Sequence, residues 1–212
     1  MLPTRAIVAA GAALILSGCD PQAGMTNLQK EAVRADEVKP YAGATRMFGA
    51  VPETIAGANQ FGFRAGAYAP TGGDPAWRVV GNPIFVSGTS APRPNRVHFD
   101  AYGAAGDAFD TIRFAIDLTD ERWVPLARPR FHNILRGFVA QSRVRDMAVL
   151  RAVLTETPTT GAVDGIPVAI TVTPIEGQRG ARRVTVTFSR PGATSAVNPP
   201  ISTPPTGNMQ GS

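Results

Sequence analysis

Several stretches of the chain alternate apolar and polar residues, which is typical of β-strands that have one buried face. Alternation predicts strands at 96–102, 111–118, 166–173 and 184–189, and two short, largely apolar runs predict strands at 77–80 and 84–87. The links at 103–110 and 176–180 are short enough for antiparallel hairpins. Pro167 and Pro174 indicate that the strand at 166–173 lies at an edge of the sheet, because proline cannot donate to the ladder.

The periodicity becomes helical between residues 129 and 154. An apolar stripe with helical spacing is formed by Phe131, Ile134, Leu135, Phe138 and Val139,. Pro129 suits the first turn of this helix, and a second helical run follows at 142–154. The order of strands, two helices and strands predicts an α+β fold. We expect a two-layer antiparallel sheet of four to six strands with two helices packed on one face, and a solvent-exposed opposite face rich in Arg, Thr and Asp.

The first residues have the layout of an export signal. Arg5 precedes an uninterrupted apolar run from Ala6 to Leu16, and two small residues then lead to Cys19. As a helix, this apolar segment is about 20 Å long at roughly 1.5 Å per residue. Because a bilayer core is about 30 Å thick, the segment is too short for a permanent spanning anchor.

The run Leu16-Ser17-Gly18-Cys19 resembles the lipobox of bacterial lipoproteins, and the resemblance covers residues 1–20 only. It implies that residues 1–18 are removed and that Cys19 is acylated. Two or more acyl chains give stable anchoring, so the resemblance implies a lipid-anchored, periplasm-facing protein of the bacterial envelope. Asp20 is similar to an enterobacterial signal for retention at the inner membrane, but the choice between inner and outer membrane stays open.

The alternative interpretation is an ordinary signal peptide that is cut elsewhere, with Cys19 incidental. Two observations favour lipidation. Cys19 is the only cysteine, so it has no intramolecular disulfide partner,. The residues that follow it also suit a tether better than a packed element.

We expect four segments along the chain. They are a signal peptide at 1–18, a tether with a short helix at 19–40, a single α+β domain at 41–190, and a disordered tail rich in Pro, Ser and Thr at 191–212. The tail has few groups whose burial would offset its ordering entropy. Within the domain, residues 41–75 lack a clear period and are expected to be irregular coil with one or two short strands.

Composition narrows the range of functions. All basic residues except Lys30 and Lys39 are arginines, and the formal net charge is only +5. This excess is too small to argue nucleic-acid binding, and an envelope location also argues against it. One cysteine and two histidines, His98 and His132, do not form a zinc-ligand cluster,. We therefore expect no metal and no cofactor.

Two small groups of polar residues are candidates for chemistry. His98, Asp100 and Tyr102 share the polar face of one predicted strand, with Arg96 beside them. One interpretation makes His98 a general base that Asp100 orients. The other is an exposed polar ladder between strands, which we favour because no nucleophile can be identified.

Asp107 and Asp110 lie in the predicted loop at 103–110 and form a weak candidate for a calcium site. Carboxylate oxygens are suitable Ca²⁺ ligands. However, two carboxylates are few, and aspartates are ordinary turn residues,. We favour the turn.

Charge is segregated between two consecutive segments. Residues 100–121 are acidic apart from Arg113, and residues 122–151 are basic apart from Asp146. A patch for an anionic partner is predicted at Arg128, Arg130, Arg136, Arg143, Arg145 and Arg151. One interpretation is a basic helical face that binds anionic lipid or an acidic envelope protein. The alternative is a solvated face that pairs internally with the acidic segment.

The functional prediction is a lipid-anchored periplasmic protein that acts as a non-catalytic binding or assembly module. It follows from the anchor and from the absence of a recognisable nucleophile and base. Two alternatives stay open. One is an envelope hydrolase that acts on cell-wall material through His98 or His132. The other is a carrier of a small ligand or lipid, which requires an apolar cavity between the sheet and the helices.

Overall fold

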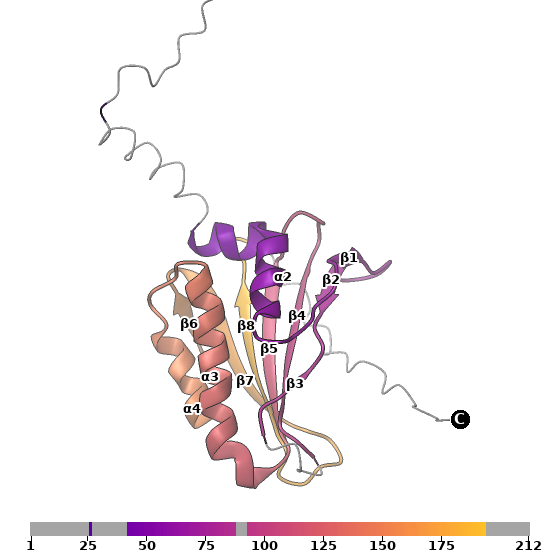
Figure 1. The fold of residues 1–212 in the computed structure, drawn as a ribbon, viewed down its shortest axis with the longest axis vertical. Coiled ribbons are helices and arrows are strands. Elements are labelled where there is room, and N and C mark those ends of the chain that lie inside the picture. Colours follow the sequence, from indigo (N-terminus) through magenta and orange to yellow (C-terminus); the bar gives the residue numbers. More distant parts are fainter. Residues whose placement is uncertain (1–25, 27–41, 88–92, 194–212) are drawn as a thin grey trace, which may run out of the picture. The chain divides into compact units, whose positions relative to one another are not determined.

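A computed structural model of the chain describes residues 26, 42–87 and 93–193 (Figure 1). The chain divides into two compact units, Met1–Val38 and Lys39–Ser212, and the fold described below belongs to the second. The predicted signal peptide, Cys19, nearly all of the tether and short helix, and the tail from 194 onward lie outside the described residues.

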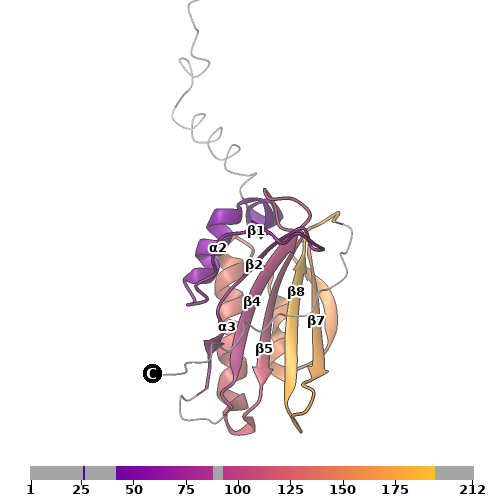
Figure 2. The ribbon, with the colours of Figure 1, turned by 90° about the vertical axis from the view of Figure 1, so that its right-hand side faces the viewer.

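An antiparallel sheet of eight strands forms the body of this unit (Figures 1 and 2). Its strands are β1 (Ala69–Pro70), β2 (Trp77–Val80), β3 (Ile84–Phe85), β4 (Arg96–Gly103), β5 (Thr111–Leu118), β6 (Thr159–Val163), β7 (Ile166–Pro174) and β8 (Arg182–Ser189). The order across the sheet is β1-β2-β4-β5-β8-β7-β6, and β3 also pairs with β4. The predicted α+β fold with an antiparallel sheet is confirmed, but the sheet has more than the predicted four to six strands.

The predicted hairpins are present, and one strand was missed. β4 pairs with β5 and β7 pairs with β8, both antiparallel. β6 was not predicted, and it pairs with the outer side of β7. The inference that β7 lies at an edge was therefore wrong. Pro167 is accommodated opposite Ala162, close to the turn that joins β6 to β7.

The long helix begins earlier than predicted. α3 spans Val124–Gln141, with a proline in its first turn and Pro129 inside it. The predicted second helix at 142–154 begins as a loop over 142–147, and its second half forms two consecutive single turns, the 3₁₀ turn η4 (Ala148–Arg151) and α4 (Ala152–Thr155). A further 3₁₀ turn, η3 (Glu121–Trp123), precedes α3.

The segment before β1 is also more helical than predicted. It contains the π-helical turn η2 (Thr45–Gly49) and the helix α2 (Val51–Asn59). Only β1 matches the short strands expected in 41–75. Pro52 suits the first turn of α2, because the amide hydrogen that proline lacks would have no helical partner there.

The hydrophobic core lies between the sheet and the helices. In both ribbon views, α2 and α3 are on the same face of the sheet (Figures 1 and 2). Phenylalanine rings fill the space under α3: Phe114 of β5 lies 4.8 Å from Phe138 of α3 and 5.1 Å from Phe99 of β4, measured between ring centroids. The interior position proposed for a carried lipid is thus occupied by side chains.

The opposite face of β4 and β5 is buried as well. Five polar residues on this face are at most 6% exposed: His98, Asp100, Tyr102, Thr111 and Arg113. Arg96 and Asp117, which pair at one end of the two strands, are half-buried. The expectation of a solvent-exposed polar face was therefore wrong for these two central strands. Buried charges are tolerated only when they are paired, so the charged side chains on this face are expected to have partners.

Candidate functional site

Asp100 is the centre of one buried ion-pair cluster. The register of β4 and β5 places Arg113 directly opposite Asp100. Arg113 donates from Nε to one carboxylate oxygen over 2.8 Å and from Nη2 to the other over 2.6 Å, a bidentate pair,. Arg78 of β2 adds a third hydrogen bond of 2.9 Å from the other side. Asp100 is therefore held by arginines and does not orient His98.

His98 pairs instead with Asp117 of β5. The distance between His98 Nε2 and Asp117 Oδ2 is 2.8 Å, and Arg183 of β8 donates to the same oxygen over 2.8 Å. Burial alone would raise the pKa of Asp117, but hydrogen bonds from Arg183 and His98 outweigh it and lower the pKa to about 2,.

This geometry does not support the proposed role of His98 as a general base oriented by Asp100. Within the described residues, His98 makes no hydrogen bond to a hydroxyl that it could activate. The exposed ladder that we favoured is also wrong, because His98 and Asp100 are buried. The two clusters lie across four neighbouring strands and join them through charged hydrogen bonds.

The predicted calcium candidate is occupied by protein groups. Asp110 forms an ion pair with Arg190 and accepts a hydrogen bond of 2.8 Å from the backbone amide of Ala104. Asp107 is exposed on the same loop. Across the described residues, no three potential metal-ligating side chains come together.

The acidic segment pairs with arginines of the strands and turns, and not with the predicted basic patch. Besides the clusters at Asp100 and Asp117, Asp110 pairs with Arg190, Asp120 with Arg122 and Glu121 with Arg182. Internal pairing between the acidic segment and the patch is therefore not found in the part of the chain that the structure describes.

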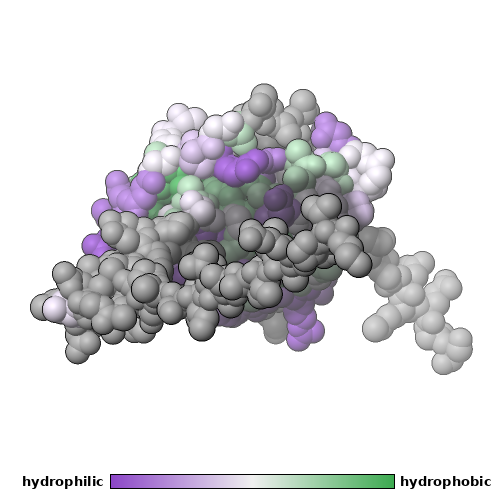
Figure 3. Space-filling model, turned by 90° about the horizontal axis from the view of Figure 1, so that it is seen from above, coloured by the Kyte–Doolittle hydropathy of each residue, from purple (hydrophilic) through white to green (hydrophobic). Residues whose placement is uncertain are grey.

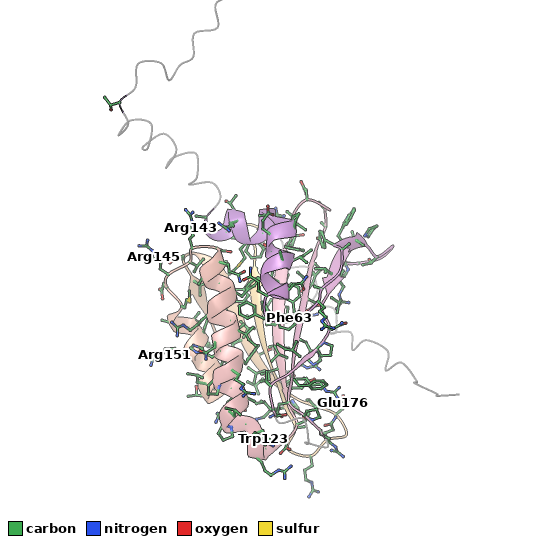
Figure 4. All side chains as sticks on the ribbon, viewed as in Figure 1. Phe63, Trp123, Arg143, Arg145, Arg151 and Glu176 are labelled. Carbon is green, nitrogen blue, oxygen red and sulfur yellow. The ribbon has the colours of Figure 1, made fainter. Side chains whose placement is uncertain are left out.

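Two of the six patch arginines are engaged elsewhere. Arg128 lies 3.4 Å from Glu156, and Arg130 donates to the backbone oxygen of Val86 over 3.1 Å. The other four are exposed and have no ion-pair partner among the described residues. We call them the helix-side arginines: Arg136, Arg143, Arg145 and Arg151. Figure 4 shows Arg143, Arg145 and Arg151 along the side formed by α3, α4 and their connecting loop.

A groove of about 370 Å³ lies within this surface, between α3 and the η4–α4 segment. Its lining residues are His132, Arg136, Met147, Ala148, Arg151 and Leu154. The Nε2 atom of His132 is buried and has no hydrogen-bond partner. Burial lowers the pKa of His132, and the positive charges of Arg136 and Arg151 lower it further.

Both cations of this groove belong to the patch that the sequence predicted, but the groove itself was not predicted. The apolar wall depends on how the loop at 142–147 returns η4 and α4 to the side of α3, and the periodicity instead indicated one continuous second helix. No carboxylate or hydroxyl lines the groove, so His132 lacks the partner that the hydrolase hypothesis required.

The surface at the end of the molecule where η2 lies has a mixed character. Its described part carries hydrophilic side chains interspersed with hydrophobic ones (Figure 3). A shallow polar pocket of about 250 Å³ lies near this end and is lined partly by Arg46 and Glu53. A carboxylate and a guanidinium both belong to its lining, so this pocket favours an anion less than the helix-side groove does.

The chain matches no protein-family model, no curated protein and no solved structure. Within the described residues, every helix is too short or too polar to span a bilayer. The geometry of these sites is therefore the basis for the proposed function.

Proposed function

We propose that this protein is a lipid-anchored module of the bacterial envelope that binds an anionic partner through the helix-side arginines. The observation that carries the proposal is the distribution of ion pairs. Five of the six acidic residues of the acidic segment are paired with arginines of the strands and turns, while the helix-side arginines have no ion-pair partner among the described residues.

The physical argument is electrostatic. Exposed cations without partners create a positive local potential that attracts anions. Each basic residue near an anionic membrane surface contributes roughly 1 kcal/mol of attraction. A module held beside a membrane by acyl chains on Cys19 would meet such a surface continuously, so several arginines on one side would favour a fixed orientation.

The test uses the chain from residue 19 onward with Cys19→Ala, so that neither the apolar segment of the predicted signal nor acyl chains mask the contribution of the arginines. We expect it to bind vesicles of phosphatidylcholine with 30 mol% phosphatidylglycerol at low salt. Binding to pure phosphatidylcholine should be negligible. Replacing Arg143 and Arg145 with Ser should weaken binding to the anionic vesicles about tenfold or more, given roughly 1 kcal/mol for each residue.

The matched control is Arg93→Ser/Arg179→Ser, which removes the same charge from exposed positions before β4 and in the β7–β8 turn. It should retain most of the vesicle binding. Thermal unfolding of both double variants should match that of the parent, because exposed charges contribute little to stability. Equal loss of binding in both variants would show that net charge, and not this surface, is responsible.

A further inference from the structure

The groove between α3 and the η4–α4 segment combines positive charge with an apolar wall. Arg136 and Arg151 both line it, and they lie close enough to His132 to lower the pKa of its imidazole. Met147, Ala148 and Leu154 supply apolar surface in the same groove. A site of this composition suits neither a simple anion nor a neutral hydrocarbon by itself.

We propose that this groove binds the phosphate group of an amphiphile, with the first carbons of its aliphatic chain against the apolar wall. The assignment rests on the proposed function, since two of the groove's cations belong to the helix-side arginines. It goes further by naming the ligand class and the residues that contact each part of it.

The two arginines favour phosphate. Guanidinium groups bind phosphate oxygens through two parallel hydrogen bonds, and two exposed arginines without ion-pair partners contribute to the lining of one groove here. His132 also lines the groove, and its buried Nε2 atom has no protein partner among the described residues. The groups that face this imidazole are cationic: Arg136 from α3 and Arg151 from η4. Arg128, on the same helix as His132, is already paired with Glu156.

The apolar lining favours an attached chain. Met147, Ala148 and Leu154 belong to the turns that face α3 across the groove, and none of them is fully buried. Covering them with methylene groups would remove apolar surface from water, which is favourable. Inorganic phosphate would leave this wall exposed, so it should bind more weakly than an alkyl phosphate.

The experiment is an NMR titration of the chain from residue 19 onward with Cys19→Ala, in which neither the apolar segment of the predicted signal nor an acyl chain can compete for the groove. The probes are hexyl phosphate, inorganic phosphate and hexanol. The imidazole signals of His132, assigned with His132→Gln, report on the groove. His98 lies in the sheet cluster, so its signals serve as an internal control.

We expect hexyl phosphate to shift the His132 signals, leave those of His98 unchanged, and bind about tenfold more tightly than inorganic phosphate or hexanol. Arg136→Ser and Arg151→Ser should each weaken this binding about tenfold, whereas Arg179→Ser and Arg143→Ser/Arg145→Ser should not. Equal affinity for hexyl phosphate and either simpler probe would overturn the assignment, as would unchanged affinity in both groove variants.

The two proposals fail differently. If hexyl phosphate does not bind while Arg143→Ser/Arg145→Ser still weakens vesicle binding, the groove assignment is wrong and the proposed function stands. If the parent chain does not bind anionic vesicles, the proposed function is wrong, and the His132 signals report separately on whether the groove takes a soluble alkyl phosphate.

Discussion

The carboxylate of Asp117 lies between an imidazole and a guanidinium that come from the two strands flanking β5. His98 of β4 and Arg183 of β8 both bind it, and these interactions lower its pKa to about 2 despite burial. Because the ordinary pKa of an aspartate is about 3.9, the charged form stabilises the folded state. This contribution is present above the unfolded-state pKa and is lost as the pH falls through about 4 toward 2.

We expect Asp117→Asn to lower the free energy of unfolding by about 2–4 kcal/mol at pH 7, because it removes the counter-charge of Arg183 and the carboxylate acceptor of His98,. Urea unfolding at pH 7 and at pH 3 measures the effect. The gap between variant and parent should narrow at pH 3, because there Asp117 is mostly protonated in the unfolded parent but still mostly ionised in the folded one, so part of the stabilisation is already lost.

Asp107→Asn is the matched control, because Asp107 is exposed in the β4–β5 loop. Its unfolding free energy should stay within about 0.5 kcal/mol of the parent at both pH values. A gap at Asp117 that does not change between pH 7 and pH 3 would contradict the assignment of a charged, paired carboxylate.

Alternation along the chain identified which side chains share the polar face but not which of them pair. The partner of His98 is set by the register between β4 and β5 and by the diagonal reach of Asp117. Neither can be read from one strand. Burial of this face was missed for a related reason: spacing predicts that Asp100 and Arg113 point the same way, but not that the surface around them is closed to solvent.

At the scale of elements, a glycine marks a close approach of another segment to α3. A Cβ atom at Gly137 would lie 2.8 Å from Cζ of Phe61, the second residue after α2. Alanine is better than glycine in a free helix by about 1 kcal/mol, but overpacking a well-filled site costs about 1–3 kcal/mol. The contact with Phe61 should therefore make an added methyl group at Gly137 destabilising.

We therefore expect Gly137→Ala to lower the free energy of unfolding by about 1 kcal/mol, the balance of packing strain and helix propensity. In a Phe61→Ala background the same substitution should be neutral or stabilising, because the obstructing ring is gone. Urea unfolding of the four proteins in this cycle measures the coupling. A stabilising Gly137→Ala in the parent would contradict the close approach of Phe61.

Gly57→Ala in α2 is a matched control for this cycle. The added methyl would meet Oε1 of Gln141, which is the end of a flexible side chain and can rotate away. Stability should change by no more than about 0.5 kcal/mol, because the propensity gain offsets the lost contact.

The elements that were predicted correctly are those with long, regular patterns, such as β5 and β8. The elements that were missed have short or weak patterns. β6 is largely exposed and contains Gly161, so it shows no alternation, although Asp164-Gly165 after it is a strong hairpin signal. Both residues have the positive φ angles that such a turn requires, 45° and 79°. The second helix was overextended because Val144 and Met147 keep helical spacing while lying in a loop.

At the scale of the whole chain, charge segregation in the sequence becomes segregation in space. The acidic segment forms the central hairpin and the start of η3, and five of its six carboxylates pair with arginines, chiefly those of β2, β5 and β8. The basic segment forms α3 and the turns that follow it, where the helix-side arginines remain exposed. In Figure 4, Glu176 of the β7–β8 turn lies on the opposite side from Arg143 and Arg145. The composition showed the imbalance, and only the fold shows where it is concentrated.

The predicted envelope location depends on acylation of Cys19. We expect the wild-type product to incorporate radiolabelled palmitate and to fractionate with membranes, because two or more acyl chains bind a bilayer stably whereas one chain binds marginally. Cys19→Ala should lose the label and move to the soluble fraction at high salt. At low salt the helix-side arginines should retain part of it on anionic membranes, and Arg143→Ser/Arg145→Ser should abolish this residual binding, since such attraction is screened by salt. An unlabelled wild-type product, or a Cys19→Ala variant that fractionates with wild type at high salt, would show that the protein is held at the membrane by other means or is not held there at all.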